Sequence, residues 1–231
     1  MAITIASRFC GPPGTGNGGY VSGMFAQEID GPAEITLRAP VPLDTPLTVS
    51  REGDIVFVKN GDTLIAEARA GQPAIDPPAA PTFAEAQDAE TRFIMHDHHI
   101  FPGCFVCGTG REDGLRLFPG AHDGDLLAAP WIPAEDLAGD DGLVAPEYLW
   151  AALDCPSYFA QPIAGEKIAL LGRFTAAINA RPKPGEKLTV AAWPMGAEGR
   201  KYFGGSTIFR EDGAPIAIAR SLWIELKQEA R

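Results

Sequence analysis

The stretch Pro146-Glu-Tyr-Leu-Trp-Ala-Ala-Leu-Asp-Cys-Pro-Ser-Tyr-Phe159 decides the fold, because it predicts one long helix with only strand-like sequence after it. A proline suits the first turn of a helix, since the N–H that it lacks would have no partner there. Leu149, Ala152 and Leu153 fall near helical spacing, so one face of this helix can be buried. Strand-like runs follow at residues 168–175, 188–193, 202–209 and 216–226, and Arg210-Glu-Asp-Gly213 predicts a hairpin turn before the last run.

The first part of the chain has the same organisation. A helix is expected at about residues 18–28, entered through Gly11-Pro-Pro-Gly-Thr-Gly-Asn-Gly-Gly19, and strands at 34–38, 47–49, 55–58 and 64–69. Short sequences also repeat, since Pro46-Leu-Thr-Val49 corresponds to Lys187-Leu-Thr-Val190. The pattern predicts an α+β fold in which a unit of one helix and an antiparallel sheet occurs twice.

The domain boundaries follow from composition. Residues 1–75 form the first unit, residues 76–100 a linker and residues 101–231 the second unit. The linker begins within the Pro-rich stretch Gln72 to Pro81, which predicts a stiff, extended chain, and ends in a His-rich turn.

Composition also excludes some classes of partner. The chain has 231 residues, 45% of them hydrophobic, and a net charge of -11. Nucleic acids and anionic membrane surfaces need clustered Lys and Arg, so neither is expected as the main partner. No segment approaches the roughly 20 apolar residues of a membrane helix. Four cysteines in a chain of this length do not resemble a disulfide framework, so a cytoplasmic location is expected.

Several motifs resemble those of the double-hotdog acyl-CoA thioesterase-like proteins. They are Gly16-Asn-Gly-Gly-Tyr-Val-Ser-Gly23, His99-Ile-Phe-Pro-Gly-Cys-Phe-Val-Cys-Gly108, Trp150-Ala-Ala-Leu-Asp-Cys155, Gly199-Arg-Lys201 and Ala219-Arg-Ser-Leu-Trp-Ile224. The resemblance implies two fused hotdog domains, each a long helix wrapped by an antiparallel sheet. It also implies an acyl thioester substrate such as acyl-CoA, no cofactor or metal beyond that CoA, and a homodimer.

The Gly-rich stretch before the first helix has two interpretations besides a plain turn. As a nucleotide-phosphate loop it fails, because Asn17 stands where the phosphate-binding Lys must be and Gly18 replaces the Mg²⁺-binding hydroxyl. As the start of a hotdog helix it leaves backbone N–H groups unpaired, and these can hold the oxygen of a thioester carbonyl as charge develops on it. The resemblance assigns this catalytic role to Gly18 and Gly19, beside Asn17.

Asp154 is the expected catalytic acid. It lies among apolar neighbours on the second helix, where a carboxylate is costly to bury without a partner or a function. In the resembling enzymes an Asp or Glu on this helix acts as general base or nucleophile at the thioester. The first helix has Ala26 and Gln27 near the equivalent position, so one composite site per chain is expected. The alternative is an Asp that only binds a nearby backbone group or Arg.

Five residues are expected to bind substrate, namely Asn17, Tyr20, Trp150, Arg200 and Lys201. The basic turn Gly199-Arg-Lys201, together with Arg173 or Arg181, suits the phosphates of CoA. A solvated hairpin turn explains the same charges equally well.

The cysteines leave open whether the chain binds zinc. Cys104-Phe-Val-Cys107 has zinc-ligand spacing, and His96, His98 and His99 precede it. All ligands would then come from one short loop, so a packed loop without metal is the alternative. Cys155 is expected to be a small buried apolar residue.

Three functions remain after these considerations. The first is thioester hydrolysis by Asp154 with Gly18 and Gly19. The second is an acyl or small-ligand binding module that keeps the fold without turnover. A hydratase is disfavoured because His96, His98, His99 and His122 lie outside both helices.

Overall fold

The computed structural model describes residues 2–227. Met1 of the first predicted domain and residues 228–231 of the second lie outside the described residues. Its helices are α1 (Gly18–Ala26), α2 (Phe83–Glu90) and α3 (Pro146–Phe159), with two 3₁₀ turns, η1 (Ser7–Phe9) and η2 (Glu135–Leu137). Its strands are β1 (Ala2–Thr4), β2 (Ala33–Leu37), β3 (Pro46–Glu52), β4 (Ile55–Asn60), β5 (Thr63–Ala70), β6 (Gly120–Asp123), β7 (Leu126–Trp131), β8 (Ala169–Ile178), β9 (Leu188–Glu198), β10 (Lys201–Arg210) and β11 (Pro215–Glu225).

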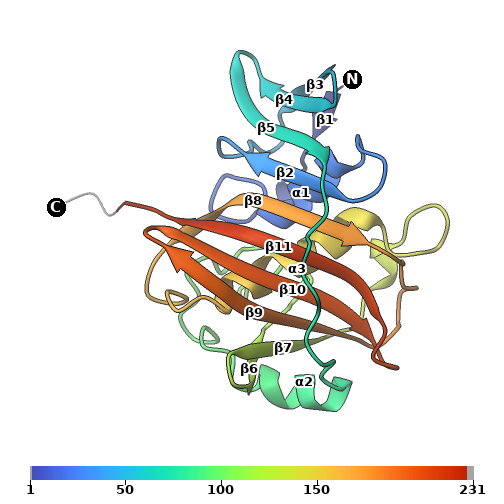
Figure 1. The fold of residues 1–231 in the computed structure, drawn as a ribbon, viewed down its shortest axis with the longest axis vertical. Coiled ribbons are helices and arrows are strands. Elements are labelled where there is room, and N and C mark those ends of the chain that lie inside the picture. The colour runs from blue at the N-terminus through green and yellow to red at the C-terminus, as the bar shows by residue number, and fades with distance from the viewer. Residues whose placement is uncertain (1, 228–231) are drawn as a thin grey trace.

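All the strands belong to one antiparallel sheet, in the order β1-β3-β4-β5-β2-β8-β11-β10-β9-β7-β6. The first half of the chain contributes one side of this order and the second half the other. The halves meet where β2 pairs with β8, with Ile35 opposite Phe174. The two long helices lie behind the sheet in Figure 1, α1 behind the first half and α3 behind the second. Each half is therefore one helix wrapped by an antiparallel sheet, which is the hotdog arrangement.

The helices α1 and α3 run antiparallel and touch through glycines. A Cβ atom added to Gly19 would lie 2.4 Å from the Cβ of Asp154, and one added to Gly23 would lie 2.6 Å from the Cα of Glu147. Next to these contacts, at the C-terminal end of α1, Gln27 Nε2 donates to Glu147 Oε2 of α3 at 3.1 Å. Only residues without side chains allow this approach, so the α1 glycines fix how closely the two halves meet.

The predicted helices and strands are all present in the structure, with one shorter than expected and four further elements beside them. The second helix has the predicted bounds, and the first ends at Ala26 instead of residue 28. The strands β1, β6 and β7 and the helix α2 were not predicted. The strands β1 and β6 are short and lie at the two edges of the sheet, so they carry little apolar pattern.

The helix α2 lies within the segment predicted as linker. Thr82 caps it, since Thr82 Oγ1 accepts from Glu85 N–H and the Glu85 carboxylate accepts from Thr82 N–H. Its buried residues, Ala86 and Ala89, pack against Ala128 of β7. The helix α2, within the predicted linker, therefore packs against strands of the second half. Residues 71–82 have no helix or strand and cross the face of the sheet opposite the long helices (Figure 1).

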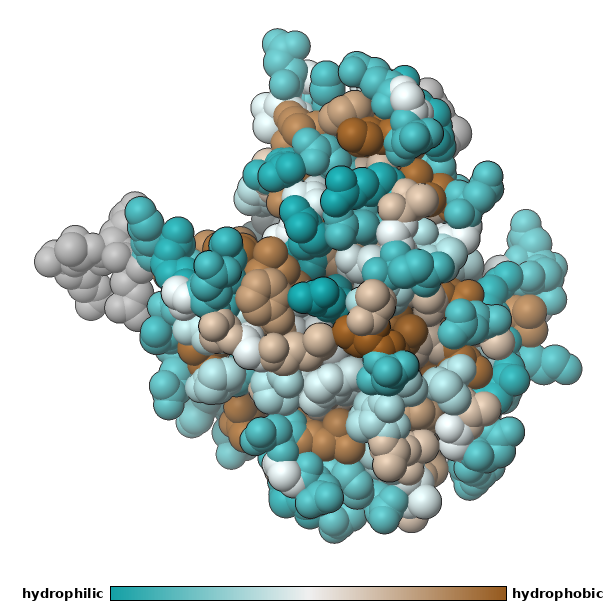
Figure 2. Space-filling model, in the orientation of Figure 1, coloured by the Kyte–Doolittle hydropathy of each residue, from teal (hydrophilic) through white to brown (hydrophobic). Residues whose placement is uncertain are grey.

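The core is apolar and continuous between the halves, and includes Phe25, Ile35, Leu149, Leu153 and Phe174. Figure 2 shows the outer face of the sheet, on which polar residues predominate and apolar ones lie in small groups. Among the described residues, no helix has both the length and the hydropathy needed to cross a bilayer.

Candidate active site

A cavity of about 340 Å³ lies beside the N-terminus of α1 and is lined by both halves of the chain. The first half contributes residues 11–18 and 37–41. The second contributes segments near residues 95–107, 154–159, 168–172 and 223–226. Most of the lining side chains are apolar, and they include Leu37, Val41, Met95, Phe101, Phe159, Leu171 and Trp223. The cavity has the size and lining typical of small-molecule pockets, which span roughly 300–1,000 Å³.

Asp154 lines this cavity from α3 and is 1% exposed. Its Oδ2 accepts hydrogen bonds from the backbone N–H of Gly19 at 2.9 Å and from Asn17 Nδ2 at 3.0 Å. Asn17 is also the N-cap of α1, because its Oδ1 accepts from the N–H of Tyr20. The acid of one half therefore binds the helix start of the other half. The Oδ1 atom of Asp154 is buried and has no hydrogen-bond partner within residues 2–227.

Burial changes the acidity of this carboxyl group. Removal from water raises the pKa of Asp154 to about 7, and the hydrogen bonds from Gly19 and Asn17 offset only part of that rise. A carboxyl group with this pKa exchanges a proton readily near neutral pH, as a general base must.

The backbone N–H groups of Gly18 and Gly19, at the start of α1, differ in whether they have a hydrogen-bond partner. Gly19 N–H is occupied by Asp154, so it is not open to a second acceptor in this arrangement. Gly18 N–H, in contrast, has no hydrogen-bond partner among residues 2–227. Gly18 lines the cavity, and a Cβ atom added to it would lie 3.6 Å from Asp154 Oδ2. A free N–H at the positive end of a helix thus lies next to the acid.

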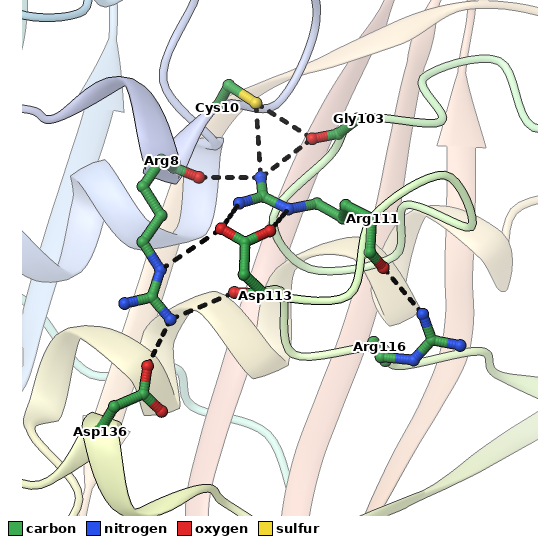
Figure 3. A network of polar contacts seen from close by, with 7 residues as sticks. All are labelled: Arg8, Cys10, Gly103, Arg111, Asp113, Arg116 and Asp136. Atoms are coloured by element: carbon green, nitrogen blue, oxygen red, sulfur yellow. Dashed lines mark hydrogen bonds and ion pairs between the residues drawn. The ribbon is translucent and has the colours of Figure 1, made fainter.

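The loop of residues 101–117 closes over this site and is tied to the first half. Phe105 N–H donates to Cys10 O at 2.8 Å. Arg111 donates to Arg8 O and Gly103 O, and forms a paired interaction with the carboxylate of Asp113 (Figure 3). A guanidinium with this many fixed partners holds the loop rigidly.

The same loop brings three cysteines together at the cavity. The sulfurs of Cys104, Cys107 and Cys155 all lie within 4.8 Å of one another, and all three residues are buried. Hydrogen bonds from the thiols of Cys107 and Cys155, and then from backbone N–H groups, hold the pKa of Cys104 well below its usual range. Sequence analysis treated Cys155 separately, although the Cys104–Cys107 spacing indicated part of the cluster.

Of the three histidines beside that motif, His99 lines the cavity. His99 Nδ1 accepts from Phe101 N–H, its Nε2 is buried without a partner within the described chain, and burial lowers its pKa. His96 packs against Phe93 and Phe118 instead, with Nε2 3.2 Å from Glu90 O. The cluster's third sulfur therefore comes from α3, and no histidine belongs to the group.

Two predicted substrate contacts lie away from the cavity lining. Tyr20 stacks on Phe9, with ring centroids 3.9 Å apart, and burial raises the pKa of its hydroxyl. Trp150 packs between the helices and contacts Phe174 edge to face. Both side chains therefore shape the core around the site.

Arg200 and Lys201 lie at the turn between β9 and β10. Arg200 Nη1 donates to Glu225 O at 2.8 Å, and Lys201 Nζ is 3.9 Å from Glu198 Oε2. Neither lines the cavity, but Ile224 and Leu226, which flank Glu225, do. The two cations thus lie close to one end of the cavity. Arg181, in contrast, is bound to Asp141 and to the carbonyls of Leu143 and Val144.

Comparisons with known proteins bear on the fold. No family model and no curated protein matches this sequence. Among solved structures, the tesB protein of Mycobacterium avium subs paratuberculosis is 12% identical, with a TM-score of 0.63 over 98% of this chain and 92% of that chain. The acyl-CoA thioesterase II TesB2 of Mycobacterium marinum is 13% identical, with a TM-score of 0.60 over 91% and 89%.

A hot dog fold protein of unknown function from Alicyclobacillus acidocaldarius is 11% identical, with a TM-score of 0.60 over 99% of this chain and 93% of that chain. Identities this low establish shared architecture, and they confirm the predicted resemblance at that level. The chain has the α+β double-hotdog fold found in thioesterase II structures.

Proposed function

We propose that this chain hydrolyses an acyl thioester, such as an acyl-CoA, at one composite site between its two hotdog halves. One observation carries the proposal: the buried carboxylate of Asp154 lies beside the unpartnered N–H of Gly18, at the wall of an apolar cavity. The shared fold with thioesterase II structures supports the same function.

Each part of the site has a role in this reaction. The acyl chain lies against the apolar lining, and the thioester carbonyl oxygen accepts from Gly18 N–H. Asp154 takes a proton from water as the water attacks the carbonyl carbon, and negative charge develops on the oxygen at Gly18. The intermediate then expels the CoA thiolate, which receives the proton from Asp154. Gly19 N–H and Asn17 hold the carboxylate in place throughout.

Asp154 as a nucleophile is the other version of this mechanism. Its carboxylate attacks the carbonyl carbon and releases CoA, and water then hydrolyses the resulting anhydride. A single turnover in ¹⁸O-labelled water with excess enzyme identifies the nucleophilic version in which water attacks the Asp154 carbonyl. A general base predicts that the first acid released carries ¹⁸O from the solvent, whereas attack at the acyl carbon followed by hydrolysis at the Asp154 carbonyl leaves it unlabelled. Absence of any acid product would contradict both.

A non-catalytic binding module is the second candidate, and one observation favours it. Asp154 already has a structural role, because it bridges the two halves through Gly19 and Asn17. That role would persist in a protein that binds an acyl group without turnover. Such a protein would bind an acyl-CoA stoichiometrically and return it intact.

We propose that Arg200 and Lys201 bind the phosphates of CoA, since both lie near the end of the cavity formed by β11. Replacing both with Ala should raise KM for an acyl-CoA by roughly tenfold with little change in kcat, because phosphate contacts do not change in the transition state. The matched substrate is the N-acetylcysteamine thioester of the same acid, which lacks phosphates. Its kinetics should not change, and an equal loss with both substrates would contradict this role.

Two further expectations extend the proposal. We expect the protein to act in the cytoplasm, where acyl-CoA is available as a substrate class, and to form a homodimer. Sedimentation equilibrium measures the mass directly, and a monomer at all concentrations would contradict the dimer.

A further inference from the structure

The cysteine cluster has the geometry of a metal site. Cys104 and Cys107 come from the loop that closes the cavity, and Cys155 comes from α3. The Sγ atoms of Cys104 and Cys155 are 3.7 Å apart, and all three sulfurs lie within 4.8 Å of one another. Zinc–sulfur bonds of about 2.3 Å in a tetrahedron place neighbouring sulfurs roughly 3.8 Å apart. One sulfur pair thus lies at the spacing that a tetrahedral ion requires, and the sulfur of Cys107 lies within 4.8 Å of both.

A polar side chain of the first half faces this cluster. Asn17 Nδ2 lies 3.8 Å from Cys104 Sγ and 3.7 Å from Cys155 Sγ, so one amide group faces two sulfurs. Amide donors around ligand sulfurs are the outer contacts that orient and stabilise metal ligands. Neutral thiols packed as apolar groups would need no such donor. A disulfide is not formed, because its sulfurs would be about 2.05 Å apart.

The loop is also fixed before any ion binds. Phe105, next to Cys104, is hydrogen-bonded to Cys10 of the first half, and Arg111 holds Gly103, on the other side of Cys104. A rigid CxxC segment placed against a helix cysteine needs little rearrangement to bind an ion. The site therefore links the closing loop, α3 and, through Asn17, the N-terminus of α1.

We propose that Cys104, Cys107 and Cys155 bind one zinc ion. Three thiolates select a soft or borderline ion, and zinc is the common choice for sites with these ligands. The sequence analysis expected no metal, and its zinc alternative used the upstream histidines, whereas this site takes its third ligand from Cys155. The inference does not depend on thioester hydrolysis, since a binding module of the same structure would hold the ion as well.

Three sulfurs leave one of four zinc positions for a nitrogen or oxygen ligand. His99 lines the same cavity but lies outside the sulfur group, and its Nδ1 accepts from Phe101 N–H, which leaves the ring proton on Nε2. It becomes the fourth ligand only if Nε2 loses that proton and moves toward the sulfurs. A solvent molecule from the cavity supplies the same position in its absence. Zinc held by three cysteines with a water as the fourth ligand occurs among the zinc deaminases.

Metal content of the full-length protein, purified under reducing conditions, gives the first test. We expect about one zinc per chain. After removal of zinc by a chelator, one equivalent of Co²⁺ should give strong absorption from thiolate–cobalt charge transfer and the visible bands of a tetrahedral ion. Failure of the reduced protein to bind either ion stoichiometrically would overturn the proposal. So would a cobalt spectrum that lacks the thiolate bands.

Cysteine variants give the second test. Cys104→Ser, Cys107→Ser and Cys155→Ser should each lower the zinc affinity by at least about tenfold, with Cys10→Ser as the matched control because Cys10 lies outside the group. If the variants do not fold, wild-type thiols are counted instead. Because the three thiols are buried even without an ion, the reaction is run in partial denaturant; there they should react more slowly with a thiol dye when zinc is bound than after chelation, and Cys10 should react equally in both states. Equal reactivity of the three thiols in both states would overturn the proposal.

His99→Ala identifies the fourth ligand. A shift of the cobalt visible bands with unchanged stoichiometry means that His99 binds the ion, and an unchanged spectrum means that solvent does. Both results support the three-cysteine site. Loss of zinc from His99→Ala together with retention in Cys155→Ser would replace it with a site of the loop alone.

Discussion

Asp154→Asn should lower kcat for thioester hydrolysis by roughly 10²- to 10⁴-fold, the range for loss of a general acid–base group. Asparagine has nearly the same shape and keeps an oxygen that accepts from Gly19 N–H, so the contact between the halves remains. The change removes only the ability to accept a proton or attack the substrate. Thiol release measured with a thiol-reactive dye gives kcat, and calorimetry shows whether an acyl-CoA still binds.

Glu147→Gln is the matched control. Glu147 is the other carboxylate of α3, it binds Gln27, and it does not line the cavity. This variant should keep hydrolysis within about twofold of wild type, because a glutamine preserves the hydrogen bond to the other helix. Equal losses in both variants would mean that Asp154 acts through the stability of the α3 helix and not through chemistry.

Gly19→Ala should lower the free energy of unfolding by about 3 kcal/mol, the upper part of the range for overpacking. The added Cβ would lie 2.4 Å from Asp154 Cβ, 2.6 Å from Trp150 O and 3.0 Å from Ala151 Cα. Two of these are backbone atoms, so a rotamer change cannot relieve the contact. Urea unfolding followed by tryptophan fluorescence measures the loss, and hydrolysis should fall with it, since the helices must separate at Asp154.

Gly103→Ala provides the comparison for this result. Gly103 lies in an exposed loop, and a Cβ atom added there would meet no atom within 4 Å. Its substitution should change stability by less than about 0.5 kcal/mol. A similar effect of both substitutions would contradict the account of α1 and α3 as helices in direct backbone contact.

The fold followed from sequence wherever an element carries a strong local pattern. The Pro146–Phe159 helix begins at a proline and buries a regular apolar face, and it was predicted to the residue. The long strands β8, β9, β10 and β11 were likewise predicted within a few residues. The helix α2 was missed because its mean hydropathy is low, and only two small alanines are buried. Its position depends on contacts with β7 that local sequence does not show.

The candidate site was partly predictable. Asn17, Gly18, Gly19 and Asp154 lie together in the structure, as the resemblance implied, although their functional roles remain predictions. Both N–H groups were expected to be free for a ligand, but the antiparallel contact of α1 and α3 places Asp154 on the N–H of Gly19 and, among residues 2–227, leaves only that of Gly18 free. No local sequence pattern specifies this contact. The group of three cysteines could not be predicted from local sequence either, because Cys155 lies next to Cys104 only through the packing of a loop on a helix.

The most direct test of the central claim is thiol release by the wild-type protein from a panel of short, long and aromatic acyl-CoAs. The proposed function predicts that at least one of them is hydrolysed with many turnovers per chain, and that Asp154→Asn lowers this turnover by at least roughly 10²-fold. If every acyl-CoA remains intact while one of them binds stoichiometrically, the site binds acyl groups without catalysis and the thioesterase proposal is wrong.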